Sequence, residues 1–262
     1  MDALYLPGPG GFLRYTSLPG RPPALVYLTG LGLAVWGTYD RCGVEPGLAD
    51  RRAVLVDFLG AGLSDGPEDF AYSLEDHALT IAALLDHLGL AGSVMVGYSF
   101  GGAVAVTLAA ARPDLVTALV LAEPNLDPGG GFFSRRIADQ PEDHFLKAGF
   151  HELIADARSR ARKGDRAWAV TAGMLQAAAP HGLHRSAVGL IMGTRPTMRE
   201  RLRELSIPRA IIRGGASGPD RRQDEMRASG IAYHVVPGAS HGMMWDEPDG
   251  FVAAVKAGLA GS

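Results

Sequence analysis

The sequence predicts an α/β protein built on a mostly parallel, doubly wound β-sheet. Short runs rich in Val, Ile and Leu recur along the 262 residues, and helical patterns fall between them. Strands that alternate with helices in this way form parallel sheets covered by helices on both faces. The alternation stops between residues 127 and 205, where only helical patterns follow one another. We therefore expect a helical insertion between two late strands of the sheet.

The expected strands are short apolar runs that Gly or Pro ends, which is typical of strands buried on both faces. They cover residues 24–28, 53–57, 93–97, 117–123, 208–213 and 231–236. Residues 12–18 near the N-terminus form a weaker candidate for an edge strand.

Three expected helices have clear boundary signals. Residues 74–88 follow Ser73 as the N-cap, begin with acidic residues and end at Gly89. Residues 103–111 are rich in Ala and end before an Arg–Pro pair, and residues 249–260 follow a proline. These helices are expected to cover the sheet.

The composition is that of a globular protein, with 47% hydrophobic and 20% charged residues. A formal net charge of −3 gives no electrostatic reason to expect nucleic acid or an anionic membrane as a partner. The single cysteine, Cys42, excludes an internal disulfide. The chain shows no signal-peptide pattern and no apolar run of about 20 residues. We expect a cytoplasmic protein, and the oligomeric state is left open.

Three serines match the motif G-x-S-x-G, namely Ser64, Ser99 and Ser240. Glycine accounts for 35 of the 262 residues, so the bare motif has little specificity in this chain. Ser64 and Ser240 lie in loop-like stretches, whereas Ser99 lies between an apolar strand and an Ala-rich helix. A sharp strand-to-helix turn exposes a hydroxyl beside the positive end of the helix dipole. Ser99 is therefore the candidate nucleophile.

Four segments resemble those of the α/β-hydrolase superfamily. "VGYSFGG" at residues 96–102 resembles the nucleophile turn, and "YLTGLG" at residues 27–32 resembles the first oxyanion loop. "DFLGAGLSDGP" at residues 57–67 resembles a structural loop of the family. "VPGASHGMMWDEP" at residues 236–248 resembles the loop that carries the catalytic histidine. The four segments also occur in the order that the family requires.

The resemblance implies an α/β-hydrolase fold of the serine-nucleophile branch. Residues 1–126 and 206–262 would form the core, and residues 127–205 a helical cap or lid. His241 would be the base that takes the proton of Ser99. This chemistry requires neither a metal nor an organic cofactor.

The acid of the expected triad is less clear from the sequence. The family usually has it just after the strand at residues 208–213, but residues 214–217 contain no carboxylate. Asp220 is the next acid along the chain. Glu123 ends the preceding strand, where some members of the superfamily carry their acid. We prefer Glu123, because a carboxylate at the end of a wholly apolar strand requires a partner. Asp220 remains the alternative.

The resemblance also assigns oxyanion donors and a pocket. The donors would be the backbone N–H groups of Leu31 and Phe100. Aromatic and methionine residues in the expected loops could line an apolar acyl pocket. They are Trp36, Phe132, Phe133, Met243, Met244 and Trp245.

The other histidines are not expected to take part in catalysis. Four of them lie on expected helices among charged neighbours, which predicts a surface position: His77, His87, His144 and His151. His181 and His184 have a spacing seen in metal sites, but no third ligand lies near them in the sequence, so no metal is expected.

The sequence thus predicts a serine hydrolase that cleaves an ester or thioester of a small, largely apolar substrate through an acyl-enzyme. One alternative is a small-molecule receptor on the same fold, with slow or absent turnover. Another is a different reaction of the same triad: lactone or carbon–carbon bond hydrolysis, or cofactor-free haloperoxidase activity. A dinucleotide oxidoreductase is not expected, because no G-x-G-x-x-G follows a strand in register.

Overall fold

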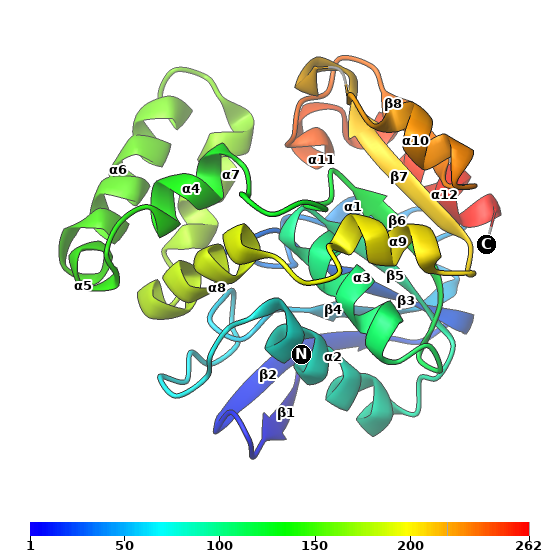
Figure 1. The fold of residues 1–262 in the computed structure, drawn as a ribbon, viewed down its shortest axis with the longest axis horizontal. Helices are drawn as coiled ribbons and strands as arrows, with labels where there is room; N and C mark the ends of the chain where they lie inside the picture. The colour runs from blue at the N-terminus through cyan, green and yellow to red at the C-terminus, as the bar shows by residue number, and fades with distance from the viewer. Residues whose placement is uncertain (219, 262) are drawn as a thin grey trace.

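The computed structural model describes residues 1–218 and 220–261 and contains an eight-stranded sheet flanked by helices (Figure 1). The strands are β1 (Asp2–Leu6), β2 (Gly11–Leu18), β3 (Arg21–Leu28), β4 (Arg51–Val56), β5 (Ser93–Tyr98), β6 (Val116–Ala122), β7 (Arg209–Gly214) and β8 (Ala232–Val236). Every expected strand is present. The edge-strand candidate is β2, but its expected edge position is wrong, because β2 lies between β1 and β4 and β1 takes the edge of the sheet. β1 was not expected from the sequence.

The helices fall between these strands and after the last of them. They are α1 (Asp40–Val44), α2 (Leu74–Leu88), α3 (Phe100–Ala111), α4 (Phe132–Ala138), α5 (Glu142–His144), α6 (Phe150–Ala161), α7 (Arg166–Leu175), α8 (Pro180–Met192), α9 (Met198–Glu204), α10 (Gln223–Ala228), α11 (Met243–Asp246) and α12 (Pro248–Ala260). A π-helical turn, Phe145–Gly149, joins α5 to α6, and a 3-10 turn, Gly215–Ser217, follows β7.

The sheet is mostly parallel, as predicted. Its strand order is β1-β2-β4-β3-β5-β6-β7-β8, and only the pairs β1–β2 and β2–β4 are antiparallel. β5, which precedes Ser99, lies near the middle of the sheet between β3 and β6. The carboxyl ends of these three parallel strands therefore meet at one edge of the sheet.

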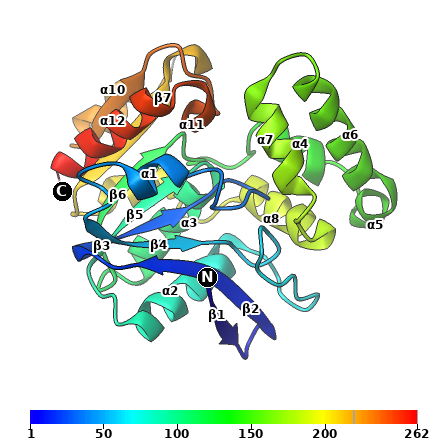
Figure 2. The ribbon, with the colours of Figure 1, turned by 180° about the vertical axis from the view of Figure 1, so that it is seen from behind.

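Helices bury both faces of the sheet. Alternate residues of each central strand point to opposite faces and so pack in different hydrophobic clusters. Val26 and Leu28 of β3 pack in the cluster that includes α2, α3 and α9. Leu25 and Tyr27 of the same strand pack in the cluster that includes α1, α11 and α12. Figures 1 and 2 show these two layers from opposite sides.

The boundaries of α2 illustrate how the sequence determines local structure. The Ser73 side chain accepts a hydrogen bond from the Asp76 amide, and Asp76 reaches back to the N-cap backbone. Gly89 ends the helix in the left-handed conformation, with φ of 63°. Both signals lie where the sequence predicts them.

The chain between β6 and β7 is helical, as predicted. α4 to α8 lie together beyond one end of the strands, whereas α9 packs against α3 beside the sheet (Figure 1). Within the described residues, no helix has the length and apolar character needed to cross a membrane.

Candidate active site

Ser99 lies in the sharp turn between β5 and α3, with φ of 51° and ψ of −113°. A positive φ is uncommon for a residue with a side chain, and such strain is typical of functional sites. The turn requires close backbone approaches on both sides of the serine. A Cβ at Gly97 would lie 2.8 Å from the carbonyl oxygen of Gly101, and one at Gly101 would lie 2.3 Å from the carbonyl oxygen of Leu28. Both glycines of the motif therefore serve the geometry of the turn.

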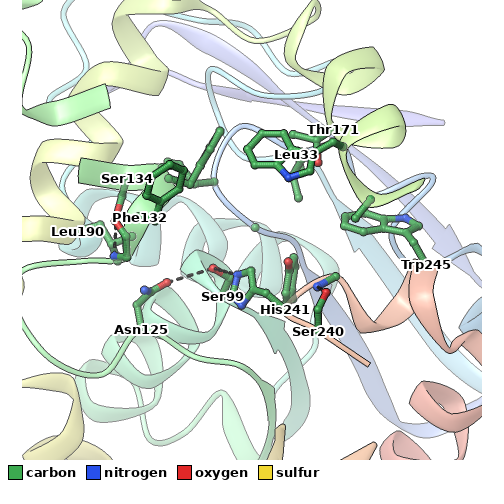
Figure 3. Close-up of a pocket in the computed structure, with 18 of the residues that line it drawn as sticks. Leu33, Ser99, Asn125, Phe132, Ser134, Thr171, Leu190, Ser240, His241 and Trp245 are labelled. Carbon is green, nitrogen blue, oxygen red and sulfur yellow. Dashed lines mark hydrogen bonds between the residues drawn. The ribbon is translucent and has the colours of Figure 1, made fainter. Parts of the chain in front are cut away.

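His241 approaches Ser99 from the loop after β8. Its Nε2 lies 3.2 Å from Ser99 Oγ, although 142 residues separate the two in the chain (Figure 3). The imidazole packs against the ring of Tyr98, with centroids 5.1 Å apart. The side chain of His241 is 53% exposed, so solvent reaches the base.

Glu123 directly follows β6, and its Oε2 lies 3.5 Å from His241 Nδ1. The carboxylate is only 8% exposed; its Oε1 accepts a hydrogen bond of 2.9 Å from the amide of Gly214, and Arg213 Nη1 lies 3.4 Å from Oε2. Burial raises the pKa of Glu123, but the hydrogen bonds from His241 and Gly214 and the charge of Arg213 outweigh it and hold this pKa below its ordinary value. The carboxylate is therefore ionised where it faces the imidazole.

Asp220, the alternative acid, makes different contacts. Its Oδ2 accepts a hydrogen bond of 3.1 Å from the hydroxyl of Tyr233, and its Oδ1 accepts one of 3.0 Å from the amide of Arg222. The structure thus brings Glu123 next to His241 and gives Asp220 partners elsewhere.

The two expected oxyanion donors lie on either side of the nucleophile turn. Phe100 is the first residue of α3, where the N–H groups of a helix have no intrahelical partner. Leu31 lies in the loop after β3 and lines the same cavity as Ser99. Neither amide donates a hydrogen bond within residues 1–218 and 220–261. Both are therefore available to a substrate oxygen.

The buried side chain of Asp57 and the half-buried side chain of Ser64 hold the neighbouring loops in place. Asp57 accepts hydrogen bonds from the amides of Val35 (2.7 Å) and Leu63 (2.9 Å). Ser64 donates to the carbonyl oxygen of Asp57 (2.6 Å) and accepts from the amide of Arg14 (2.8 Å). The first serine of the three motif matches thus has structural partners.

Ser99 and His241 open into a cavity of about 360 Å³. Its walls come from the loops at the strand ends and from α4, α7, α8 and α11, and they are mostly apolar. Three of the expected pocket residues line it, namely Phe132, Phe133 and Trp245. Among its described lining residues there is no Lys or Arg, and Asp165 is the one carboxylate.

The structure corrects the expectation for the other three pocket candidates, which do not line this cavity. Trp36 is 40% exposed, and its Nε1 donates to the hydroxyl of Thr16. Met243 and Met244 begin α11 and point into the core that packs on α12.

Two polar residues of the site were missed from the sequence. Asn125 lines the cavity, and its Oδ1 accepts a hydrogen bond of 3.1 Å from the Ser99 hydroxyl (Figure 3). Arg213 contacts Glu123 from β7. Only their positions in the sequence could have indicated a role in the site. Asn125 follows an expected strand and Arg213 lies at the end of one, at the edge of the sheet where Ser99 lies.

One histidine is placed differently from the prediction. His77 is 1% exposed and not at the surface, because it lies on the apolar face of α2 with the rings of Phe58, Phe70 and Phe100 around it. Its Nε2 lies 3.0 Å from the hydroxyl of Ser186 on α8. Burial lowers the pKa of His77 to about 3, so it is neutral at ordinary pH.

The described part of the chain contains no group of three or more His, Cys, Asp or Glu residues arranged to hold a metal ion. The two histidines with metal-like spacing contact backbone carbonyl groups. His181 Nε2 lies 3.1 Å from the oxygen of Gly66, and His184 Nε2 lies 2.8 Å from that of Gln140.

Comparisons with known proteins agree with this architecture. A family profile described as alpha/beta hydrolase fold matches residues 23–146. The 2-(acetamidomethylene)succinate hydrolase of Mesorhizobium japonicum is 30% identical over 215 residues, which cover 74% of this chain and 73% of the relative. Haloalkane dehalogenase 2 of Mycobacterium tuberculosis is 28% identical over 266 residues, covering 94% and 90%. The crystal structure of the enol-lactonase from Burkholderia xenovorans has a TM-score of 0.82 at 19% identity, covering 99% of this chain and 100% of that one.

The names of these relatives describe different reactions, so what they share with the chain is the fold and not one substrate. The profile covers the strand, turn and helix around Ser99. The alignment with the Mesorhizobium protein, at 30% identity, covers nearly three quarters of both chains. The chain therefore belongs to the α/β-hydrolase fold family.

Proposed function

We propose that the protein is a serine hydrolase that cleaves an ester or thioester of a small, neutral, largely apolar substrate. The observation that carries this proposal is the alignment of Ser99 Oγ, His241 and Glu123, with separations of 3.2 Å and 3.5 Å, at the wall of a mostly apolar cavity. Nucleophile, base and orienting acid within hydrogen-bond reach are the arrangement that activates a hydroxyl.

The proposed reaction has two halves. Ser99 Oγ attacks the carbonyl carbon while its proton passes to His241 Nε2, and Glu123 stabilises the imidazolium that forms. The N–H groups of Leu31 and Phe100 would stabilise the negative oxygen of the tetrahedral intermediate. His241 then gives the proton to the leaving group as its bond to carbon breaks. In the second half, water gives a proton to His241 and attacks the acyl carbon, and Ser99 recovers its proton.

A serine nucleophile favours acyl transfer over displacement of a halide. Attack of Oγ on a carbonyl group gives an ester, which activated water can cleave. Attack on a saturated carbon that carries a halogen would give an ether, which water does not cleave under the same catalysis. The reaction in the name of the Mycobacterium relative is therefore not proposed for this chain.

We also propose that α4 to α8 act as a cap over Ser99. This proposal rests on the cavity, whose wall includes Phe132 and Phe133 of α4, Trp168 of α7 and Leu190 of α8. The cap would exclude water from the acyl-enzyme and set the size of the acyl group.

The test is covalent labelling of the folded protein with a fluorophosphonate, followed by turnover of p-nitrophenyl esters and the matching thioesters of increasing acyl length. We expect labelling and turnover in the wild type and in the Ser64→Ala control, and neither in Ser99→Ala. Labelling without turnover would favour the receptor alternative. Absence of labelling in the folded wild type would contradict the proposal.

A further inference from the structure

Asn125 is fixed next to the nucleophile by two contacts. Its side-chain Oδ1 accepts a hydrogen bond from the Ser99 hydroxyl, at 3.1 Å, and its backbone N–H donates to the carbonyl oxygen of Ser99, at 3.4 Å. The residue follows Glu123 and Pro124 in the segment that leaves β6, and its side chain lines the cavity. In Figure 3 Ser99 lies between Asn125 and His241.

The nitrogen of the same side-chain amide, Nδ2, plays no part in these two contacts. Within residues 1–218 and 220–261, Nδ2 of Asn125 donates no hydrogen bond to the protein. An amide nitrogen carries two N–H donors. When a substrate fills a mostly apolar cavity and displaces water, a donor left without a partner weakens binding. A substrate that supplies an acceptor at this point would therefore bind better than one that does not.

The sheet topology shows which part of a substrate would meet this donor. β5 lies between β3 and β6, so Leu31 after β3 and Asn125 after β6 flank Ser99 from opposite sides. The oxygen of the reacting carbonyl would be held on the side of Leu31. A substituent near the same carbonyl would then point to the side of Asn125.

The charge around the cavity indicates that this substituent is neutral. The described lining residues include no Lys or Arg, and Asp165 contributes a negative charge. A carboxylate substituent would lack a counterion here and would face repulsion, whereas an ether or keto oxygen requires only a donor such as Nδ2.

We propose that Asn125 is a substrate-binding residue whose Nδ2 binds a neutral acceptor oxygen on the acyl group, close to the reacting carbonyl. The substrate class is then esters or thioesters of short alkoxy- or oxo-substituted acids. This inference rests on the proposed hydrolase function of the same site.

The test compares two p-nitrophenyl esters of nearly equal shape, the methoxyacetate and the butyrate, in which an ether oxygen replaces one methylene group. The ratio of their kcat/KM values is measured in the wild type, in Asn125→Leu and in Thr171→Val. The Leu variant keeps the size of the side chain and removes the donors. Thr171 lines the same cavity from α7 and provides the matched control for a lost polar group. Intrinsic reactivity of the esters cancels when ratios are compared between variants.

We expect the methoxyacetate-to-butyrate ratio to fall by about fivefold in Asn125→Leu, the size of one hydrogen bond, and to stay at the wild-type value in Thr171→Val. An unchanged ratio in Asn125→Leu, or a fall in Thr171→Val alone, would overturn the proposal. If Asn125→Leu cleaves neither ester, the wild-type ratio is compared with the ratio of the hydroxide-catalysed rates. An excess of about fivefold supports the role of the donor, and no excess contradicts it.

Failure of this inference differs from failure of the proposed function. A wild-type protein that cleaves both esters without preference for the ether refutes only the role of Asn125. A wild-type protein that cleaves neither ester and is not labelled at Ser99 refutes the hydrolase itself.

Discussion

Glu123 lies with its Oε2 3.5 Å from Nδ1 of His241, and it reaches this position from the end of β6, one strand away from the nucleophile strand β5. The amide of Gly214, at the end of β7, donates to the same carboxylate. Glu123 itself has a φ of 45°, so its backbone, like that of Ser99, has a positive φ. Two strained residues at the ends of neighbouring strands therefore hold the two ends of the Ser–His–Glu arrangement.

The first prediction concerns the acid. Glu123→Gln should lower kcat by roughly a thousandfold to ten-thousandfold, because a neutral amide neither stabilises the imidazolium nor fixes its tautomer. Circular dichroism should show an unchanged fold. Asp220→Asn is the matched control and should retain nearly full activity, since Asp220 contacts Tyr233 and Arg222 instead. Loss of activity in the Asp220 variant alone would show that Asp220, after β7, is the acid and not Glu123.

The second prediction concerns the stability of the fold in acid. His77 has a folded-state pKa of about 3, below the ordinary 6.5 that it regains on unfolding. Between these values the unfolded chain binds one more proton, so the free energy of unfolding should decrease as pH falls, by at most about 1.4 kcal/mol per pH unit. Above pH 6.5 this residue adds no pH dependence.

Urea unfolding between about pH 7.5 and 4.5 measures this effect. His77→Gln should have a shallower pH dependence, by about one proton, than the wild type. His87→Gln, at an exposed position on the same helix, should keep the wild-type slope. Equal slopes in all three proteins would show that His77 is not buried in its neutral form.

The third prediction concerns the nucleophile turn. Gly101→Ala should destabilise the protein by about 3 kcal/mol or more, because its Cβ would lie 2.3 Å from the backbone oxygen of Leu28, which cannot easily move. Gly173 lies at an exposed position in α7, where an added Cβ would meet no neighbouring side chain within 4 Å, so Gly173→Ala should stabilise by about 0.5–1 kcal/mol. Thermal and urea unfolding compare the two, and similar effects of both variants would contradict the close approach at the turn.

The fourth prediction concerns acyl size. Phe133 lines the cavity beside Trp168, with ring centroids 6.0 Å apart, so Phe133→Ala should enlarge the space for the acyl chain. The kcat/KM ratio of octanoate to butyrate p-nitrophenyl esters should increase on the order of tenfold. Trp36→Ala should leave this ratio unchanged, because Trp36 lies outside the cavity. A shift in Trp36→Ala of similar size would indicate a different acyl path.

The interior of the fold was predictable because its strands are apolar on both faces. β1 was not, since only Leu6 of its five residues is buried and the strand depends on antiparallel pairing with β2. No local pattern indicates such pairing. The burial of His77 could have been predicted from the sequence, because this residue shares a face of α2 with Leu74 and Ile81. Its charged neighbours in the sequence obscured that pattern.

The site was predictable where main-chain geometry demands particular residues, as the glycines around Ser99 do. It was not predictable where tertiary packing decides. Asn125 has no motif of its own, and its place beside Ser99 follows from the neighbouring positions of β5 and β6. Met243 and Met244 lie near His241 in sequence, yet the direction of α11 turns them into the core.

The walls of the cavity come from two separable parts of the chain. Ser99, Asn125, His241 and Trp245 belong to the part of the chain that forms the sheet, its loops and α11, whereas Phe132, Phe133 and Trp168 belong to the helices within residues 127–205. The chain crosses between the two parts only twice. A chimaera that receives this helical segment from a relative should therefore acquire the donor's tolerance for acyl length. It should keep the preference for an ether or keto oxygen that we propose for the recipient, because Asn125 lies outside the exchanged segment.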